Sequence, residues 1–208
     1  MSDFLTSITP YADELNKLGL FMGTVSGATP PVYELDGQLT RIQALILVIR
    51  LMGLEEEALS GSGKNNLLDV PSWAVKYAVY AYQNGITTGV NAEGTLFAPN
   101  RAVTCQEFTT FLLRSLGYRE SRNDFQYATA LNKALEIGLY TEDVLAELNS
   151  GTFLRGDAVV VMVNALLTPI KDSNDTLLID TLVNAGLFSS DTANEFVAAI
   201  ARADERGF

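Results

Sequence analysis

The chain has 208 residues, of which 48% are hydrophobic and 19% charged, a composition typical of a folded globular protein. Its formal net charge of −11 repels polyphosphate, so nucleic acid is not an expected partner. There is no histidine and one cysteine, Cys105, which excludes His-dependent triads, His- or thiolate-rich metal sites and intrachain disulfides. We therefore expect no metal and no cofactor.

The N-terminus carries no targeting pattern, because residues 1–8 lack a basic region followed by an apolar run. The longest weakly polar stretch, residues 158–170, is shorter than the ~20 residues that a membrane-spanning helix needs. No membrane insertion is expected. The chain is interpreted as cytosolic or as an excised piece of a larger protein.

A short sequence motif centred on a glycine, called the glycine motif below, recurs four times, each time after a segment with helical periodicity. The copies are residues 18–21, 84–87, 137–140 and 185–188. A second glycine follows four residues later in the first two copies, at Gly23 and Gly89. Because a glycine just past the last turn ends a helix in left-handed geometry, each copy predicts the end of a helix.

A capped apolar helix follows further along each unit. Thr40 with Gln43, and Thr104 with Glu107, fit a capping box, in which the hydroxyl and the side chain three residues later satisfy helix amides reciprocally. The third copy has Leu154 at the cap position, so other contacts must hold its start.

The first helix of each unit is expected to begin at a cap residue or a helix-compatible proline. These starts are residues 9–10, 71–72, 123–124 and 173–175, and Ser189 is expected to cap a last helix through about residue 203. Trp73 shares an apolar stripe with Tyr77 and Tyr80, which favours packing of Trp73 in the core over stacking on a sugar.

These patterns predict an all-α fold of three helix-loop-helix repeats in a pseudo-threefold arrangement, with a C-terminal partial repeat as a cap. The expected repeats span about residues 8–60, 68–120 and 122–172, followed by the partial repeat 173–208. The polar connectors are too short to force separate domains, so residues 1–208 are expected to form a single module.

The second repeat resembles the S-layer homology (SLH) family. Residues 68–74, Leu-Asp-Val-Pro-Ser-Trp-Ala, are similar to that family's acidic-Val-…-Trp-Ala opening. Residues 97–104 match its Phe-x-Pro loop, which precedes a helix that usually begins Thr-Arg-Ala-Glu. The first repeat is similar through residues 40–44 and the third through residues 154–157, so the resemblance covers about residues 8–172.

The resemblance implies a noncatalytic module at the bacterial cell surface that anchors a larger parent protein. Such modules bind secondary cell-wall polysaccharide, often through pyruvylated sugar ends, in grooves between repeats. The positions that match the groove residues of the family are Thr40, Arg41, Asp69, Trp73, Gly85, Gly89 and Arg155. Cys105 stands where the family usually has arginine, and the third repeat lacks the second glycine and the Phe-x-Pro loop.

The chemistry of arginine supports this assignment independently. A pyruvyl ketal presents a carboxylate, and a guanidinium beside free amides at a helix N-terminus offers that anion a two-pronged hydrogen bond and a favourable dipole. The alternative is that Arg41 and Arg155 pair with surface carboxylates at repeat junctions. Asp69 could instead cap a helix, and Gly85 and Gly89 could be structural stops whose backbone approaches a ligand only incidentally.

Two other function classes remain open. A hydrolase could use two of the 25 carboxylates, although nothing marks out a pair. A helical-repeat adaptor could bind a protein or self-assemble, and would show a continuous exposed apolar strip. Without a histidine to activate it, Cys105 is expected to be a packed residue and not a nucleophile. The run Glu55 to Glu57 is interpreted as a solvated helix end or loop.

Overall fold

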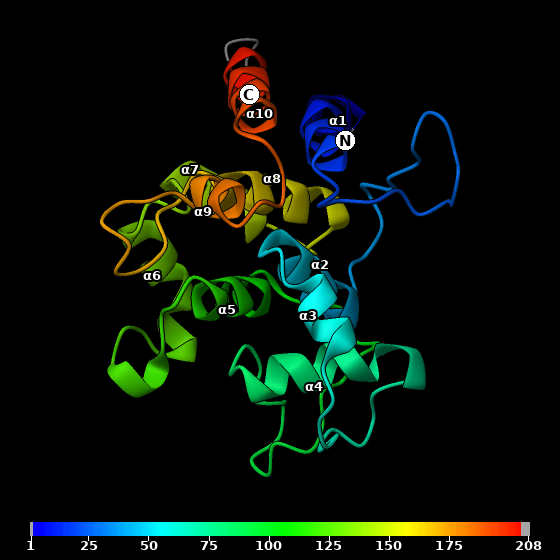
Figure 1. Ribbon diagram of the computed structural model, residues 1–208, viewed down its shortest axis with the longest axis vertical. Coiled ribbons are helices and arrows are strands. Elements are labelled where there is room, and N and C mark those ends of the chain that lie inside the picture. The colour runs from blue at the N-terminus through cyan, green and yellow to red at the C-terminus, as the bar shows by residue number, and fades with distance from the viewer. Residues whose placement is uncertain (1, 205–208) are drawn as a thin grey trace. The chain divides into compact units, whose positions relative to one another are not determined.

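The computed structural model describes residues 2–204, and over this range the chain is helical with connecting loops and no β-strand (Figure 1). The predicted all-α class is confirmed. The chain divides into two compact units. The central unit is Leu39–Phe153, and the discontinuous unit combines Met1–Gln38 with Leu154–Phe208. The boundaries of the three repeats and their assembly into a single module stay predictions.

The central unit is built around α2 and α5. Helix α2 packs against α3, α4 and α5, and α5 packs against α6. The bounds are α2 Arg41–Leu51, α3 Glu55–Ser60, α4 Val75–Gln83, α5 Cys105–Ser115, α6 Ala130–Glu136 and α7 Glu142–Leu148, with 3-10 turns at Ser72–Ala74, Glu120–Arg122 and Tyr127–Thr129.

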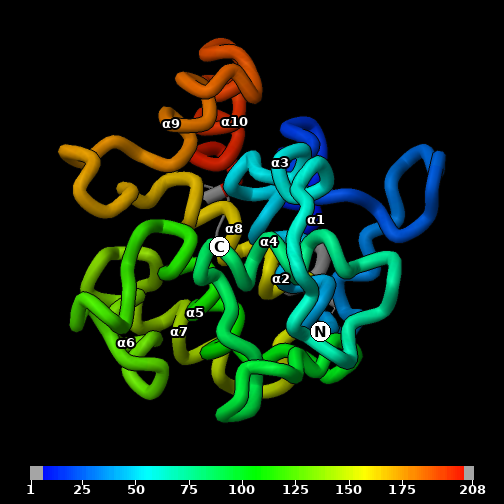
Figure 2. Tube along the Cα trace, turned by 60° about the horizontal axis from the view of Figure 1, so that its bottom comes forward, coloured from blue at the N-terminus to red at the C-terminus, as the bar shows by residue number. Residues whose placement is uncertain are grey.

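The discontinuous unit places α1 against α8 and α10, and α9 also contacts α8 and α10. The bounds are α1 Ser2–Lys17, α8 Arg155–Leu166, α9 Leu178–Asn184 and α10 Ser190–Asp204. Between α1 and residue 38 the chain forms an open loop, drawn in blue, which extends away from α1 (Figures 1 and 2). No described helix is long and apolar enough to cross a membrane.

The predicted helix caps and stops are confirmed. The Thr40 amide donates to Gln43 Oε1 at 3.0 Å, and the Thr104 amide donates to Glu107 Oε2 at 3.1 Å. The Leu154 amide donates to the Asp157 carboxylate at 2.7 Å, which supplies the missing cap of α8. The central glycines of the four glycine motifs, Gly19, Gly85, Gly138 and Gly186, all have φ between 67° and 78°, as helix-ending glycines require.

Two expected helix starts are confirmed and three are wrong. The turn before α4 follows Pro71, and Ser189 Oγ accepts from the Thr192 amide. Helix α1 begins before the predicted residues 9–10 and contains Pro10, because burial of its apolar face against α8 outweighs the cost of an internal proline.

The starts expected at 123–124 and 173–175 fail because their polar side chains stabilise loops and not helix ends. Asp124 accepts from the Arg119 amide at 2.7 Å, and Ser173 Oγ donates to the Ile170 carbonyl at 2.6 Å. Helices α6 and α9 begin several residues later.

The prediction that Trp73 packs in the core is wrong, because its side chain is 62% exposed. Residues Ser72–Ala74 form a 3-10 turn, whose threefold winding puts Trp73 out of phase with the helix that follows. The buried stripe begins one residue later, with Ala74, Tyr77, Ala78 and Ala81.

The acidic run at residues 55–57 forms the first turn of α3 and is more than a solvated end. Glu55 pairs with Arg50 at 2.8 Å and accepts a hydrogen bond of 2.6 Å from the Tyr77 hydroxyl. Burial opposes ionisation of Glu55, but the hydrogen bonds from Arg50 and Tyr77 outweigh it and lower its pKa. This carboxylate therefore ties α2 and α3 to α4.

Candidate functional site

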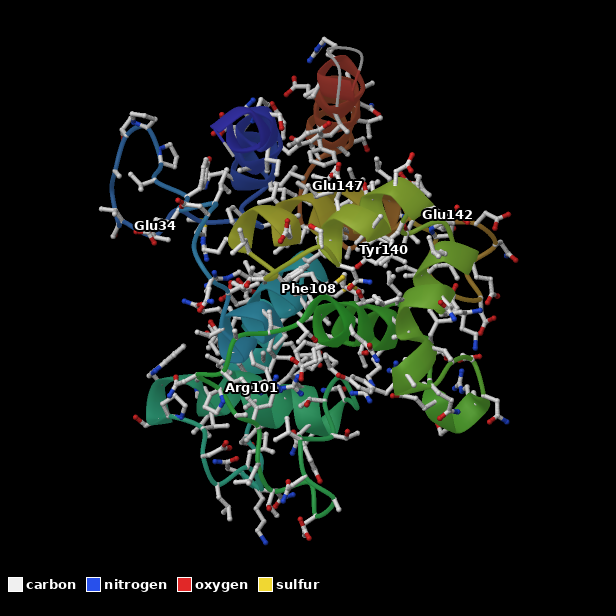
Figure 3. The ribbon with its side chains drawn as sticks, turned by 180° about the vertical axis from the view of Figure 1, so that it is seen from behind. Glu34, Arg101, Phe108, Tyr140, Glu142 and Glu147 are labelled. Carbon is white, nitrogen blue, oxygen red and sulfur yellow. The ribbon has the colours of Figure 1, made fainter. Side chains whose placement is uncertain are left out.

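A hollow of about 380 Å³ lies in the central unit. Its lining includes three arginines from different segments of the chain, Arg41, Arg101 and Arg114, and residues 88–91, which include Gly89. The other lining residues are Glu107, Thr110, Phe111 and Tyr127. The hollow therefore gathers three guanidinium groups in an acidic chain. Arg101 is labelled in Figure 3.

One face of α5 forms a wall of this hollow. Glu107, Thr110, Phe111 and Arg114 are spaced i, i+3, i+4 and i+7, so a single helical stripe presents them together. The sequence reasoning missed Arg101, Glu107, Arg114 and Tyr127 as site residues. The polar positions of this stripe, which interrupt an otherwise apolar face, are the signal that could have found Glu107 and Arg114.

The first turn of α2 lies against the loop formed by residues 97–101. The Arg41 amide donates to the Arg101 carbonyl at 2.8 Å, and the Ile42 amide donates to the Pro99 carbonyl at 3.1 Å. The expectation that Arg41 lies beside free helix amides is therefore wrong. The amides of Arg41 and Ile42 are not free to bind an anion.

The Arg41 side chain is buried, with 6% of its surface exposed. Its Nε donates to the Phe97 carbonyl at 3.0 Å, and Nη1 lies 3.0 Å from Glu107 Oε1. The guanidinium carbon is 4.9 Å and 4.7 Å from the ring centroids of Phe97 and Phe111. Burial lowers the pKa of Arg41, and the charge of Glu107 opposes that effect.

Glu107 also binds Arg101. Its Oε2 accepts from Arg101 Nη1 at 3.1 Å, and its Oε1 accepts from Nη2. Burial disfavours the Glu107 carboxylate, but the bonds from Arg101, the charge of Arg41 and the Thr104 amide together lower its pKa. The side chain of Arg101 is 45% exposed, so it is the outer partner of this carboxylate.

Arg114 connects α5 to the glycine motif at residues 84–87. Its Nη1 donates to the Ile86 carbonyl at 3.1 Å, and its Nε lies 3.1 Å from both carboxylate oxygens of Glu120. Tyr127 also lines the hollow and is exposed, and its carbonyl accepts from Gln106 Nε2 at 2.6 Å. An exposed aromatic ring beside cations suits a sugar that carries an anionic group.

Asp69 holds the loop that contacts Arg41. It caps no helix, and its two carboxylate oxygens accept from the amides of Phe97 at 2.8 Å and Ala98 at 2.7 Å. The carbonyl of Phe97 accepts in turn from Arg41. Asp69 thus fixes the loop to which Arg41 binds, although it does not line the hollow.

The other predicted residues divide clearly. Gly89 lines the hollow, whereas Gly85 and Trp73 do not. Gly85 ends α4 with φ 67°, as the structural alternative expected. Thr40 serves as the cap of α2.

Arg155 lies in the discontinuous unit with contacts that parallel those of Arg41. Its Nε donates to the Tyr33 carbonyl at 2.9 Å, and its guanidinium carbon is 4.9 Å from the Phe21 ring centroid. The Arg155 amide donates to the Gly37 carbonyl at 3.0 Å. Burial lowers the pKa of Arg155, and Glu34 opposes that effect. No ion pair joins Arg155 to another described residue.

Cys105 is buried, with 4% of its surface exposed, as the sequence predicted. Its Sγ is 4.0 Å from Thr109 Oγ1, which lies 2.7 Å from the hydroxyl of the buried Tyr140 (Figure 3). In residues 2–204 no group of three or more His, Cys, Asp and Glu side chains could hold a metal ion.

We expect the Cys105 thiol to react with an aromatic disulfide reagent about a hundredfold more slowly in the native chain than in urea, because the reagent must wait for local opening. Stopped-flow absorbance measures both rates. Equal rates in buffer and in urea would show that Cys105 faces an open pocket.

No model of a known protein family matches this chain. It is 31% identical over 164 residues to a "Cell surface protein" of Thermoanaerobacter kivui, covering 77% of this chain and 20% of that protein. It is 30% identical over 160 residues to a "Middle cell wall protein" of Brevibacillus brevis, covering 76% of this chain and 14% of that protein. A third relative, an "Endoglucanase" of Bacillus sp. (strain KSM-635), is 30% identical over 113 residues, 54% of this chain and 11% of that protein.

The chain therefore spans a fifth or less of the length of these relatives. The names of the first two support a cell-wall-associated role and a location at the cell surface or in the cell wall.

Proposed function

We propose that this chain is a noncatalytic cell-wall anchoring module of the SLH type. It binds secondary cell-wall polysaccharide through carboxylates such as those of pyruvylated sugar ends. The parent protein to which it belongs would carry any further activity. The names of two relatives, a cell surface protein and a middle cell wall protein, are compatible with this role.

The observation that carries the proposal is the hollow lined by Arg41, Arg101 and Arg114. A guanidinium binds a carboxylate with two parallel hydrogen bonds, which an ammonium cannot do. The three guanidinium groups outnumber the two carboxylates that pair with them, Glu107 and Glu120, which leaves local positive charge in a chain with a net charge of −11. At physiological salt, charges beyond ~8 Å are largely screened, so the cations near the ligand dominate.

The proposal is tested by sedimenting the full chain with purified bacterial walls whose secondary polymer is pyruvylated. We expect binding to intact walls and its loss from walls stripped of that polymer. Walls whose pyruvyl groups have been removed by mild acid should bind at least tenfold less, because one charge-assisted contact is worth ~1.5–3 kcal/mol. Equal binding to intact and stripped walls would rule out this anchoring role.

A second candidate is a helical-repeat adaptor that binds a protein. Two large apolar side chains near the start of the second repeat favour it, because Leu68 and Trp73 are exposed. If the adaptor role is correct, Trp73→Ser should weaken capture of a protein partner and leave binding to isolated wall polymer unchanged. If the unsubstituted chain binds wall polymer in the absence of other proteins, the anchoring role is favoured.

A further inference from the structure

The cationic hollow already contains an anion of its own. Glu107 bridges two arginines from different segments, with Oε1 3.0 Å from Arg41 Nη1 and Oε2 3.1 Å from Arg101 Nη1. A carboxylate held by two guanidinium groups occupies the place that a ligand carboxylate would need.

The two arginines differ in their freedom to exchange this partner. Arg41 is buried and is also held by the Phe97 carbonyl and by two aromatic rings. Arg101 is 45% exposed, and its guanidinium has Glu107 as its partner among the described residues. Water and salt reach the Arg101 end of this pair and weaken it, whereas the side chain of Glu107 is only 9% exposed. Arg101 can therefore exchange Glu107 for a ligand carboxylate more readily than Arg41 can.

We propose that Glu107 is an internal counter-ion which an anionic ligand displaces from Arg101, so that Glu107 limits the affinity of the hollow for charged saccharides. The inference rests on the proposed function and adds a ligand-contacting residue, Arg101, and a competing one, Glu107. Arg41 keeps its bond to Glu107 and acts as a positioning residue. A neutral saccharide does not compete with Glu107 for Arg101, so the affinity of the chain for it does not depend on this exchange.

The charge of Glu107 is not needed for its other role, the cap of α5. Glu107 accepts from the Thr104 amide at 3.1 Å, and Gln43 does the same for the Thr40 amide at 3.0 Å in α2. A glutamine thus serves the same cap elsewhere in this unit. The substitution Glu107→Gln retains the cap and removes the competing charge.

The test uses isothermal titration of the full chain with two probes, a methyl hexoside carrying a 4,6-pyruvyl ketal and the uncharged methyl ester of the same compound. We expect Glu107→Gln to bind the charged probe about tenfold more tightly than the unsubstituted chain, called the parent below, because the probe no longer displaces a carboxylate. Affinity for the ester should change less than twofold. Glu56→Gln is the matched control, since it removes the same charge from an exposed position outside the hollow.

Arg101→Gln supplies a second, independent measurement on an exposed side chain. We expect about a tenfold loss of affinity for the charged probe, with Lys64→Gln in the exposed connector as the charge-matched control. If Arg101→Gln binds the charged probe like the parent, the proposed exchange is wrong, even where Glu107→Gln does not fold.

The outcomes separate the two proposals. Binding of the charged probe by the parent, with no change in either variant, would overturn the role of Glu107 and leave the anchoring function standing. Absence of binding by the parent and by Glu107→Gln alike, together with no retention on walls, would overturn both. Weaker binding by a folded Glu107→Gln would show that Glu107 supports the ligand and does not compete with it.

Discussion

Arg41→Ala is expected to lower the free energy of unfolding by about 3–5 kcal/mol, the largest loss among the site substitutions. The substitution leaves Glu107 buried with one partner fewer and leaves the Phe97 carbonyl without its donor. It also opens a gap between the rings of Phe97 and Phe111. Removing one member of a buried ion pair costs more than the pair itself contributes, because the remaining charge stays desolvated.

The matched control is Arg101→Ala, which removes the other guanidinium from the same carboxylate. Arg101 is 45% exposed, so its loss leaves no buried gap, but the buried Glu107 carboxylate loses a hydrogen-bond partner, and we expect a cost of about 1–2 kcal/mol. Urea unfolding followed by far-UV circular dichroism measures both variants. Similar midpoints for Arg41→Ala and the parent would show that Arg41 contributes little to stability.

The helices and their ends could be predicted from sequence because their signals are local. A capping box spans four residues, and a helix-ending glycine acts on the turn that precedes it. Both Thr40 and Thr104 form their predicted caps. The wrong starts at 123–124 and 173–175 have the same composition as a cap, but their side chains bond to loop atoms. Composition alone does not distinguish the two uses of Asn, Asp and Ser.

The hollow could not be predicted because its contacts join distant residues. Arg41 meets Glu107 across 66 positions and the Phe97 carbonyl across 56. The motif that pointed to Arg41 gives the residue type and its place at the start of α2, but not its partner. Asp69 illustrates the same limit, since its carboxylate binds amides 28 and 29 residues away.

Trp73 shows how a small change in winding alters burial. The apolar stripe predicted from Trp73, Tyr77 and Tyr80 assumes 100° per residue throughout. The 3-10 turn at Ser72–Ala74 rotates the chain by about 120° per residue. Ala74 is consequently buried and Trp73 is exposed.

Gly89 and Gly85 both have positive φ, 84° and 67° respectively, but their surroundings differ. A Cβ atom at Gly89 would lie 2.8 Å from the Leu96 carbonyl oxygen and 3.2 Å from the Gly94 Cα. A Cβ atom at Gly85 would have no neighbour within 4 Å. Left-handed geometry alone costs an alanine about 1–2 kcal/mol, and the backbone clash adds to this cost only at Gly89.

We therefore expect Gly89→Ala to lower the free energy of unfolding by about 3 kcal/mol and Gly85→Ala by about 1 kcal/mol. The new methyl group would clash with the Leu96 carbonyl, which accepts a hydrogen bond from the Val90 amide at 2.7 Å. The clash therefore separates these two segments and displaces residues 88–91.

Residues 88–91 line the hollow, so Gly89→Ala should also bind the charged saccharide more weakly at temperatures where it is fully folded. Gly85→Ala should bind it like the parent. Urea unfolding and isothermal titration on the same pair of variants separate the two effects. Equal stability losses in the two variants would mean that the 88–91 segment yields to the methyl group without strain.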